Sequence, residues 1–370
     1  MKKIRVLHVA SSHMMGLTNQ ETQLALAYKS LADVDITVVS GENEQVNGSF
    51  NALNFAGIPF EIINGFDSHR NIFRLIKRFK NITKRIKPDI VSVNTNWQLV
   101  IVSLARFLSR QNHKIIYTIH GFRHNHPIKS IIARSLIGSL LFLFADVINA
   151  PTSYVCKNFA WLKYKIKTIP LGEDDLFFIN SKLPDFSKPL SFCFAGQFRE
   201  GKNQSMLIAA FSDYLEKTHD LKARLILPGE GELLESCKIL AIRLGVSDQV
   251  IFPGQLNRIE MIEVYKNCQI ALVPTNSETF GHCIAEPLVM KRIVLSRPVG
   301  IASDVIINGV NGYFFDTKSQ LVDTMLAMRE LPEVDLIRIS ECAGKIGQIF
   351  NWIVVAKMNV KELMKPIINL

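Results

Sequence analysis

The sequence predicts an α/β protein with two Rossmann-like domains facing each other across a cleft, and three observations support this fold class. Short apolar runs rich in β-branched residues alternate with helical stretches, as expected for parallel sheets built from βαβ units. The series of runs begins a second time after a polar stretch over residues 181–188. The length of 370 residues also exceeds the size at which a single core usually stops growing.

Each predicted strand is a short β-rich run bounded by polar or glycine-containing turns. In the first series the predicted strands cover 4–10, 35–40, 60–63, 89–94, 114–120, 146–150 and 166–170, and the first helix covers 20–31. In the second series the predicted strands cover 190–195, 223–228, 250–253, 270–274, 292–296 and 312–315. In open sheets of this kind, ligands bind at the carboxyl ends of the strands.

The composition is that of an ordinary globular protein, with 48% hydrophobic and 21% charged residues. The six cysteines are scattered singly without a C-x-x-C pair, which argues against a disulfide framework or a zinc site and favours the reducing cytoplasm. The N-terminus is typical of a first strand and not of a signal peptide. The longest apolar run, 136–145, is far shorter than the ~20 residues that span a bilayer, so we expect a soluble chain.

The net charge of +10 is unevenly distributed along the chain. Residues 1–175 hold 22 Lys and Arg against 12 Asp and Glu, whereas residues 176–370 hold 21 of each. The first half therefore carries the whole imbalance, which indicates that this half faces an anionic partner.

Two glutamates with seven residues between them, Glu278 and Glu286, are the most informative feature of the sequence. An apolar run over 270–274 and a polar turn precede Glu278, and a good helix-forming segment surrounds Glu286. The first carboxylate is therefore predicted on a loop at the end of a strand, and the second within the following helix. Two solvated glutamates are the alternative for this spacing taken alone.

The segment between the two glutamates is suited to bind phosphate. Gly281 lets a ligand approach the backbone closely. The amides of Gly281, His282 and Cys283 are predicted at a helix N-terminus, where donors lack partners within the helix. Carboxylates that flank a phosphate seat suit a ligand that is both phosphorylated and rich in hydroxyls, and a nucleotide sugar fits that description.

A second group of residues suited to phosphate lies on the turn after the predicted strand 190–195. Gly196, Arg199 and Lys202 place two cations on a glycine-bearing turn, where they can neutralise a diphosphate. A solvated basic loop is the alternative for this turn taken alone. The Pro-Gly-Glu-Gly turn at 228–231 and the Phe-Pro-Gly turn at 252–254 are predicted to open at the same sheet edge.

In their order and spacing these segments resemble the GT-B glycosyltransferases, specifically the large retaining group called family 4, or glycosyl transferases group 1. The resemblance covers essentially the whole chain and is strongest over 192–315. It implies an acceptor-binding Rossmann-like domain over 1–175 and a nucleotide-sugar-binding domain over 176–350. It also implies a C-terminal helix over 351–370 that packs back on the first domain.

The resemblance further implies roles for individual residues of the donor site. Lys202 pairs with the donor diphosphate, Glu278 contacts hydroxyls of the donor sugar, and Glu286 accepts hydrogen bonds from the ribose. Backbone amides that contact the sugar and phosphate come from Gly281, His282, Cys283 and Ile284.

Three further positions bear on this resemblance. His120, which ends a predicted strand of the first domain, is expected to project towards the transferring carbon. The family often has arginine directly after the glycine of the basic turn, whereas this chain has Gln197, and Arg199 is the candidate substitute. The first strand–helix loop keeps a single glycine, Gly16, which we expect to contact a phosphate on the acceptor side.

The mechanism implied by the resemblance is sugar transfer with retention of anomeric configuration, by front-face attack, from a UDP- or GDP-sugar. The protein positions the reactants and stabilises charge on the leaving diphosphate, so neither a dedicated nucleophile nor a cofactor is required. The acidic run 173–175 looks superficially like a metal-binding motif, but we interpret it as turn and helix capping. We expect no metal.

Residues 69–87 predict a cationic amphipathic helix. Its basic residues, with no acidic residue in the span, are Arg70, Arg74, Lys77, Arg78, Lys80, Lys84, Arg85 and Lys87. Its apolar residues recur at helical spacing and are Ile72, Leu75, Ile76, Phe79, Ile82 and Ile86. The apolar stripe is expected to pack on the first sheet, and the basic face is either solvated or in contact with anionic lipid.

The function we expect is therefore a sugar transferase that builds a surface polysaccharide, capsule or lipopolysaccharide, with a glycan or lipid-linked acceptor. It is expected in the cytoplasm or peripherally at the inner face of the cytoplasmic membrane. An NAD(P) oxidoreductase is the first alternative, although the first strand–helix turn lacks G-x-G-x-x-G. A nucleic-acid-binding protein is the second, although the chain shows no helix-turn-helix, zinc or RNA-sheet motif, so no nucleic-acid partner is expected.

Overall fold

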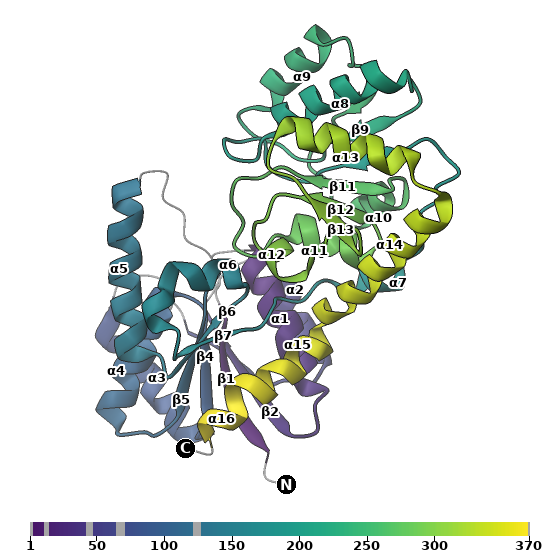
Figure 1. The fold of residues 1–370 in the computed structure, drawn as a ribbon. Helices are drawn as coiled ribbons and strands as arrows, with labels where there is room; N and C mark the ends of the chain where they lie inside the picture. Colours follow the sequence, from purple (N-terminus) through teal and green to yellow (C-terminus); the bar gives the residue numbers. More distant parts are fainter. Residues whose placement is uncertain (1–2, 11–14, 42–46, 64–70, 121–126, 369–370) are drawn as a thin grey trace. The chain divides into compact units, whose positions relative to one another are not determined.

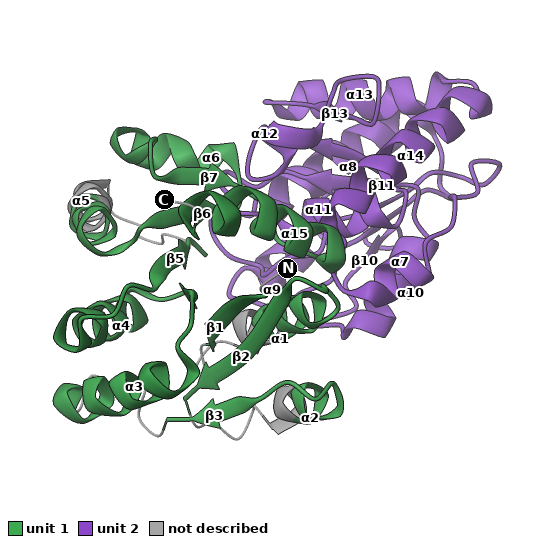
Figure 2. Cartoon of the chain, turned by 90° about the horizontal axis from the view of Figure 1, so that it is seen from below, with its two compact units in different colours: residues 1–172, 352–370 green, residues 173–351 purple. Residues whose placement is uncertain are grey.

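The computed structural model describes residues 3–10, 15–41, 47–63, 71–120 and 127–368. The chain divides into two compact units (Figures 1 and 2). Unit 1 comprises Met1–Gly172 and Trp352–Leu370, and unit 2 comprises Glu173–Asn351. Each unit contains one parallel sheet with helices packed on it, so the prediction of two Rossmann-like domains is confirmed.

Unit 1 is built on seven parallel strands in the order β3-β2-β1-β4-β5-β6-β7. The strands are β1 (Ile4–Ala10), β2 (Val34–Ser40), β3 (Phe60–Ile62), β4 (Ile90–Val93), β5 (Lys114–Thr118), β6 (Val147–Ala150) and β7 (Ile166–Thr168). The helices that connect them are α1 (Met15–Lys29), α2 (Asn47–Phe55), α3 (Ile72–Ile86), α4 (Asn96–Ser109), α5 (Pro127–Phe144) and α6 (Ser153–Cys156), followed by the 3₁₀ segment Lys157–Leu162. The central strands β4 and β6 are buried at every residue, as expected for a sheet covered on both faces.

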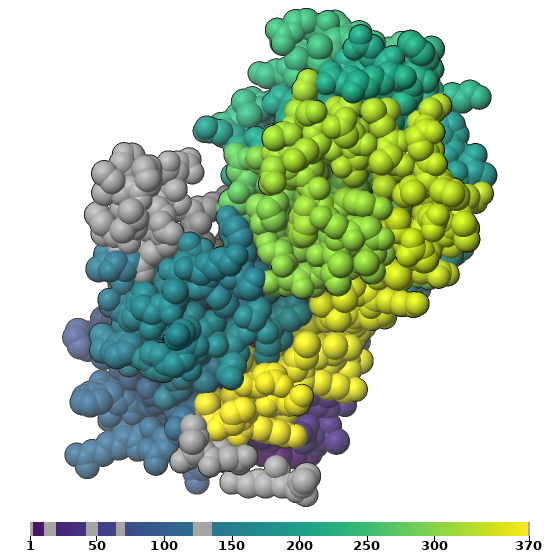
Figure 3. All heavy atoms as spheres, in the orientation of Figure 1, coloured from purple at the N-terminus to yellow at the C-terminus, as the bar shows by residue number. Residues whose placement is uncertain are grey.

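Two hydrophobic cores lie on the two faces of this sheet. One core packs α3, α4 and α5 against the strands, and the other packs α1, α2 and the C-terminal helix α15 (Trp352–Met358). Figure 2 shows α3 and α4 on one side of the unit 1 strands and α1 and α2 on the other. In Figure 3 the C-terminal residues, in yellow, lie against N-terminal residues in purple. The predicted packing of the C-terminal helix on the first domain is confirmed by its contact with α1.

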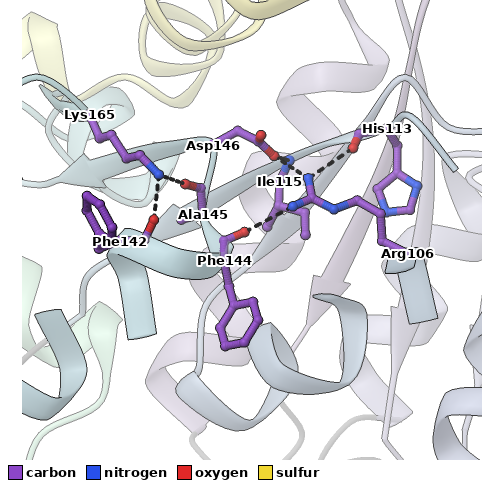
Figure 4. Close-up of polar contacts among 8 residues, drawn as sticks. All are labelled: Arg106, His113, Ile115, Phe142, Phe144, Ala145, Asp146 and Lys165. Atoms are coloured by element: carbon purple, nitrogen blue, oxygen red, sulfur yellow. Dashed lines mark hydrogen bonds and ion pairs between the residues drawn. The ribbon is translucent and has the colours of Figure 1, made fainter. Parts of the chain in front are cut away.

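A polar network joins helices and strands of unit 1 at the amino ends of β5 and β6 (Figure 4). Arg106 of α4 pairs with Asp146 and donates to the carbonyls of His113 and Phe144. Asp146 also accepts from the amide of Ile115 at 2.7 Å. These contacts satisfy charged groups at the amino ends of β5 and β6 and so hold the two strands in position. The polar residues described below follow the carboxyl ends of the strands.

Unit 2 is built on six parallel strands in the order β10-β9-β8-β11-β12-β13. The strands are β8 (Ser191–Cys193), β9 (Arg224–Ile226), β10 (Val250–Ile251), β11 (Ile270–Val273), β12 (Ile293–Ser296) and β13 (Gly312–Phe314). The longer helices are α8 (Gln204–Thr218), α9 (Leu234–Arg243), α10 (Arg258–Lys266), α11 (His282–Val289), α13 (Lys318–Glu330) and α14 (Glu333–Gly347), and the short ones are α7 (Asp175–Ile179) and α12 (Ala302–Val305). Capping boxes at Asn257 and Thr317 begin α10 and α13.

A fully buried arginine, Arg292, ties the centre of unit 2 together. Its Nε donates to the carbonyl of Met290 at 2.9 Å, and one Nη donates to the carbonyls of Tyr265 at 2.7 Å and Cys268 at 3.0 Å. Its other Nη donates to the carbonyl of Lys182. The polar stretch 181–188 therefore belongs to unit 2 and does not separate the units, which divide between Gly172 and Glu173.

All the predicted strands occur, and most of them are shorter than predicted by one or two residues at an end. The first helix begins at Met15, five residues before the predicted start. Among the described residues, no helix is both long and apolar enough to cross a bilayer.

Candidate active site

The turns that follow the unit 2 strands form a cavity at the carboxyl edge of the sheet. Its lining comes from the turns after β8, β9 and β10 and from α10 and the start of α11. The lining residues used below are Gly196, Arg199, Gly229, Glu230, Glu232, His282, Cys283 and Glu286. The predicted donor residues of the basic turn and of the Glu278–Glu286 segment thus meet at one edge, as parallel topology requires.

Glycines on the β9 turn let two backbone segments approach each other closely. Gly229 has φ +140°, and a Cβ at this position would lie 2.1 Å from the carbonyl oxygen of Gly196. Gly231 has φ +148°, and its Cβ would lie 2.3 Å from the carbonyl oxygen of Phe198. Hydrogen bonds from Gly196 N to Pro228 O at 3.0 Å and from Phe198 N to Glu230 O at 2.8 Å hold the two turns together. The sequence requires glycine here because the β8 and β9 turns touch.

The basic turn and the first glutamate are joined directly. The ammonium of Lys202 pairs with the carboxylate of Glu278, and both side chains are largely buried. Among the described residues the buried Nε of Arg199 has no hydrogen-bond partner, although its side chain lines the cavity. Leaving a buried guanidinium donor without a hydrogen bond costs free energy. Arg199 is therefore the group of this turn best suited to bind an anionic ligand.

The start of α11 follows a glycine in the left-handed region, Gly281, with φ +98°. The amides of Ile284 and Ala285 donate to the Gly281 carbonyl at 2.9 and 3.1 Å. The predicted ligand contact through the Ile284 amide is therefore not supported, because that amide is engaged within the first turn and its side chain is fully buried. The contacts predicted for this segment remain with Gly281, His282 and Cys283.

The second glutamate, Glu286, lies one turn into α11 and faces the cavity. Its carboxylate accepts a hydrogen bond from the hydroxyl of Tyr265 at 2.8 Å. Burial raises the pKa of Glu286, the nearby charge of Glu173 adds to the increase, and His282 and Tyr265 oppose it, so that the pKa is about 7. Glu286 can therefore exist in either protonation state near neutral pH, and a ligand hydroxyl can donate to it or accept from it.

Glu173, which the sequence assigned to turn and capping, belongs to the site. It is 4% exposed, and its carboxylate lies 2.7 Å from Nδ1 of His282. Burial lowers the pKa of His282, but the charge and hydrogen bond of Glu173, with the charges of Glu286 and Glu278, outweigh that effect and raise the pKa to about 9. Capping is confirmed for Asp174, which accepts from the amide of Leu176 at 3.0 Å. The interpretation of Glu173 was wrong because its partner is 109 positions away in the sequence.

Glu173, His282 and Glu286 also present atoms within 4.8 Å of one another that could bind a metal ion. The side chains already take part in hydrogen-bond contacts, because Nδ1 of His282 lies beside the Glu173 carboxylate and the Glu286 carboxylate accepts from Tyr265. These hydrogen bonds account for the arrangement without a metal ion, and the expectation that no metal is needed remains a prediction.

The predicted unit 1 residues lie at the carboxyl edge of the first sheet. His120 follows β5, and its Nε2 lies 3.1 Å from Oδ1 of Asn94, at the end of β4. Both residues line a cavity with the buried His8 and with Asn149. Gly16 lies in the first turn of α1. The contacts of residues 15–19 are not described, so the acceptor-side contact of Gly16 stays a prediction.

Comparisons with known proteins agree with this geometry. A model described as Glycosyltransferase Family 4 matches residues 16–175, and one described as Glycosyl transferases group 1 matches residues 177–335. The alpha-monoglucosyldiacylglycerol synthase of Streptococcus pneumoniae is 22% identical over 77% of this chain and 69% of its own length. The D-inositol 3-phosphate glycosyltransferase of a Nocardioides species is 29% identical over 43% of this chain and 38% of its own. An uncharacterized glycosyltransferase of Methanocaldococcus jannaschii, 28% identical, is matched over 34% of this chain and about a third (32%) of its own length.

Solved structures share the whole architecture. A glycosyltransferase from Rickettsia africae superimposes with a TM-score of 0.77 at 18% identity, over 99% of both chains. Anabaena HepE in complex with UDP-glucose superimposes with a TM-score of 0.73 at 18% identity, over 98% of this chain and all of the other. At this level of identity the superpositions establish the fold and no more.

Proposed function

Because the chain belongs to glycosyltransferase family 4, the glycosyl transferases group 1, we propose that it moves a hexose from a UDP-sugar to a glycan or lipid-linked acceptor in surface-polysaccharide synthesis. Family membership makes the chain a nucleotide-sugar glycosyltransferase of the retaining class and removes the support for the oxidoreductase and nucleic-acid alternatives. The donor base, the acceptor and the pathway are the parts that need experiment.

The observation that carries this proposal is the arrangement of charge at the carboxyl edge of unit 2. Arg199 offers a buried guanidinium donor, and the ammonium of Lys202 is held at Glu278. In the proposed complex both cations face the diphosphate, and Glu278 is left to accept hydrogen bonds from the donor sugar. Glu286, with Tyr265 behind it, binds the ribose hydroxyls.

The chemistry that follows is departure of the sugar from a diphosphate whose charge the protein stabilises. Breaking the glycosidic bond leaves negative charge on the β-phosphate, where Arg199, Lys202 and the N-terminal amides of α11 are placed to stabilise it. The acceptor hydroxyl then attacks from the face that the leaving group vacates and passes its proton to the diphosphate. In this proposal His120 lies near the transferring carbon and orients the reactants.

The uridine base is proposed from the solved relatives of the same fold. Anabaena HepE has been determined with UDP and with UDP-glucose. A GDP-sugar is the alternative donor, since the β10 turn that would meet the base offers backbone groups that either base can use.

A lipid-linked acceptor is proposed from the surface of α3. The helix buries Leu75, Ile76 and Phe79 against the sheet and leaves Arg74, Lys77, Arg78 and Lys84 exposed. Phe73 is 85% exposed beside them. Residues 69 and 70 of the predicted basic span lie outside the described residues. A cationic face with an exposed aromatic ring suits an anionic membrane surface, where each Lys or Arg contributes ~1 kcal/mol.

The membrane part of the proposal predicts binding to vesicles that depends on α3. Lys77→Glu with Arg78→Glu should strongly reduce co-sedimentation with phosphatidylglycerol vesicles, whereas uncharged phosphatidylcholine vesicles should bind neither protein. Lys217→Glu with Lys238→Glu on unit 2 makes the same change in charge and serves as the control. Equal loss of binding in both pairs would show that net charge, and not α3, governs the association.

The experiment that tests the donor site is a thermal-shift screen of the purified protein with UDP, GDP and ADP and their common sugar conjugates. A ligand at one hundred times its Kd stabilises the protein by ~2.7 kcal/mol. We expect stabilisation by uridine nucleotides, without added metal, and its loss in Glu286→Ala. A folded protein that responds to none of these nucleotides would overturn the proposal.

A further inference from the structure

The proposed donor cavity is poor in cations for a ligand that carries a diphosphate. Among the described charged residues that line it, Arg199 is the one permanent cation, while Glu230 and Glu232 are exposed carboxylates. Gln197, beside the glycine of the basic turn, is neutral and exposed. Lys202 stands behind this lining in its pair with Glu278. A nucleoside diphosphate therefore meets fewer positive groups here than its charge calls for.

Besides Arg199, His282 is the ionisable nitrogen-containing side chain among the described residues that line this cavity. Its side chain is 38% exposed and lines the cavity, whereas its partner Glu173 is almost fully buried and does not line it. The pair is neutral as a whole, but its positive end faces the cavity and its negative end lies behind it. At short range such an oriented pair attracts an anion.

The ring of His282 is held in place from several sides. Glu173 lies 2.7 Å from Nδ1, and the amide of Glu173 donates to the carbonyl of Phe350 at 2.8 Å. The ring of Phe280 packs edge-on against the imidazole with centroids 5.1 Å apart, and Phe350 packs against Phe280 at 5.7 Å. Because Glu173 fixes Nδ1, the opposite edge of the ring is directed away from the buried carboxylate.

The ionisable groups around the imidazole favour its charged form. Glu173 makes the largest contribution, and Glu286 and Glu278 add to it, which together outweigh burial and raise the pKa of His282 to about 9. On the other elements packed nearby, Arg258 of α10 and Lys202 are engaged with Asp174 and Glu278. Tyr265 donates to Glu286, and burial raises the pKa of Tyr265 so that it stays neutral. Cys283 stays a thiol for the same reason, since burial raises its pKa.

We propose that His282, anchored by the buried carboxylate of Glu173, is a third cation of the donor diphosphate site, beside Arg199 and Lys202, and supplies the charge that Gln197 does not. This inference rests on the proposed donor site and assigns two of its residues. His282 contacts the diphosphate through its outer edge, and Glu173 is a positioning residue that keeps the imidazole protonated and oriented.

The test is calorimetric binding of UDP and uridine to the full chain and to His282→Gln, His282→Lys and Glu173→Gln. We expect His282→Gln to weaken UDP about tenfold and to leave uridine within about twofold, because only UDP carries the diphosphate. His282→Lys should recover most of the UDP affinity. Lys318→Gln, which removes an exposed cation paired with Asp213 elsewhere in unit 2, is the matched control and should bind like the unaltered chain.

The dependence on pH separates a charge role from a merely structural one. In the unaltered chain the imidazolium is present throughout neutral pH and is lost only as pH rises through about 9. In Glu173→Gln the main group that raises the pKa is gone, so UDP affinity should fall between pH 6 and pH 8. The double variant Glu173→Gln with His282→Gln should lack this fall, which isolates His282 from the titration of Glu286 and of UDP itself.

The outcomes distinguish the inference from the function on which it rests. Failure of the folded, unaltered chain to bind UDP would overturn the donor site as a whole. Binding by the unaltered chain that His282→Gln leaves unchanged, or weakens equally for UDP and uridine, would overturn the role of His282 and keep the donor site. Unfolding profiles of each variant establish that the comparison is made on folded protein.

Discussion

The two sheets have the same strand order apart from the additional edge strand β7 of unit 1, and they carry different polar groups at their carboxyl edges. In unit 1 the carboxyl edge carries side-chain amides that bond to the backbone. Asn94 donates to the carbonyl of Val9 at 3.2 Å, and Gln98 donates to the carbonyl of Ala10 at 3.2 Å. In unit 2 the corresponding edge carries the charged pairs Lys202–Glu278 and His282–Glu173, at 2.7 Å for the second. Parallel topology fixes where a ligand binds, and the side chains at that edge decide its charge.

This difference matches the two substrates of a transferase. In the proposed complex the diphosphate meets fixed cations and helix N-terminal amides on unit 2, from Arg199, Lys202 and the start of α11. The hydroxylated acceptor is proposed to meet hydrogen-bonding groups on unit 1, such as Asn94 and His120. We expect nucleotide binding and catalysis at the unit 2 edge to be lost when its backbone spacing or charge changes. We expect the stability of unit 1 to depend on the protonation of a buried histidine.

The largest effect should come from closing the gap between the two glycine turns of unit 2. Gly229→Ala places a Cβ 2.1 Å from a backbone oxygen at φ +140°, so the turns must separate. We expect a loss of about 3 kcal/mol in unfolding free energy and loss of nucleotide binding. Chemical unfolding and UDP titration measure both. Gly201→Ala, at φ +83° with nothing within 4 Å of its Cβ, is the control and should cost much less; equal losses would contradict the packing argument.

The next effect is on catalysis and tests the charge of the unit 2 edge. Lys202→Met removes a cation proposed to face the leaving diphosphate and leaves Glu278 without its partner. We expect kcat/KM for the donor to fall about 10²-fold, by analogy with removal of one group that stabilises transition-state charge. Nucleotide release in the presence of acceptor measures it. Lys318→Met should retain activity, and a Lys202→Met protein as active as the unaltered chain would remove Lys202 from the mechanism.

Acid should affect unit 1 through a buried histidine. Neither ring nitrogen of His8 has a hydrogen-bond partner in the described part of the chain, and burial lowers its pKa from 6.5 to about 4. The neutral ring is therefore favoured in the folded protein, and its contribution to stability is present above pH 6.5 and is lost as pH falls towards 4. The shift corresponds to a loss of about 2 kcal/mol between pH 7 and pH 5.

His8→Leu measures this contribution because it fills similar space without a titrating group. Unfolding free energy at pH 7 and pH 5 should differ less in this variant than in the unaltered chain. Part of the acid sensitivity should remain, because burial also lowers the pKa of His113 to about 4. An unchanged dependence on pH would show that His8 gains a compensating partner when protonated.

The smallest effect on stability should come from the exposed face of α3. Lys77→Glu and Arg78→Glu alter solvated side chains opposite the buried stripe, so unfolding free energy should change by less than about 0.5 kcal/mol each. Thermal unfolding checks this expectation. A large loss would show that these cations support unit 1 and would weaken their proposed role at a membrane.

The sequence was sufficient for features that depend on local pattern. Alternating strand and helix signals predicted both sheets, and the spacing of Glu278 and Glu286 with Gly281 predicted a loop followed by a helix N-terminus. The basic stripe of α3 followed from helical periodicity alone.

Features that depend on distant pairing could not be predicted in this way. Glu173 and His282 meet across 109 positions, and Arg292 reaches carbonyls up to 110 positions away. Nothing local separates Glu173 from its acidic neighbours Asp174 and Asp175, although only Glu173 is buried. The sequence likewise gives no sign that Tyr265 is more than a core aromatic residue. The structure shows that its hydroxyl donates to Glu286.

Hydrogen–deuterium exchange of the full chain with and without saturating UDP tests most directly whether unit 2 holds the donor. We expect slower exchange at 196–203 and 281–286 of unit 2, and little change at Asn94, His120 and Asn149 of unit 1. Protection centred on the unit 1 residues, with residues 196–203 and 281–286 unchanged, would contradict the assignment of the diphosphate to the charged edge.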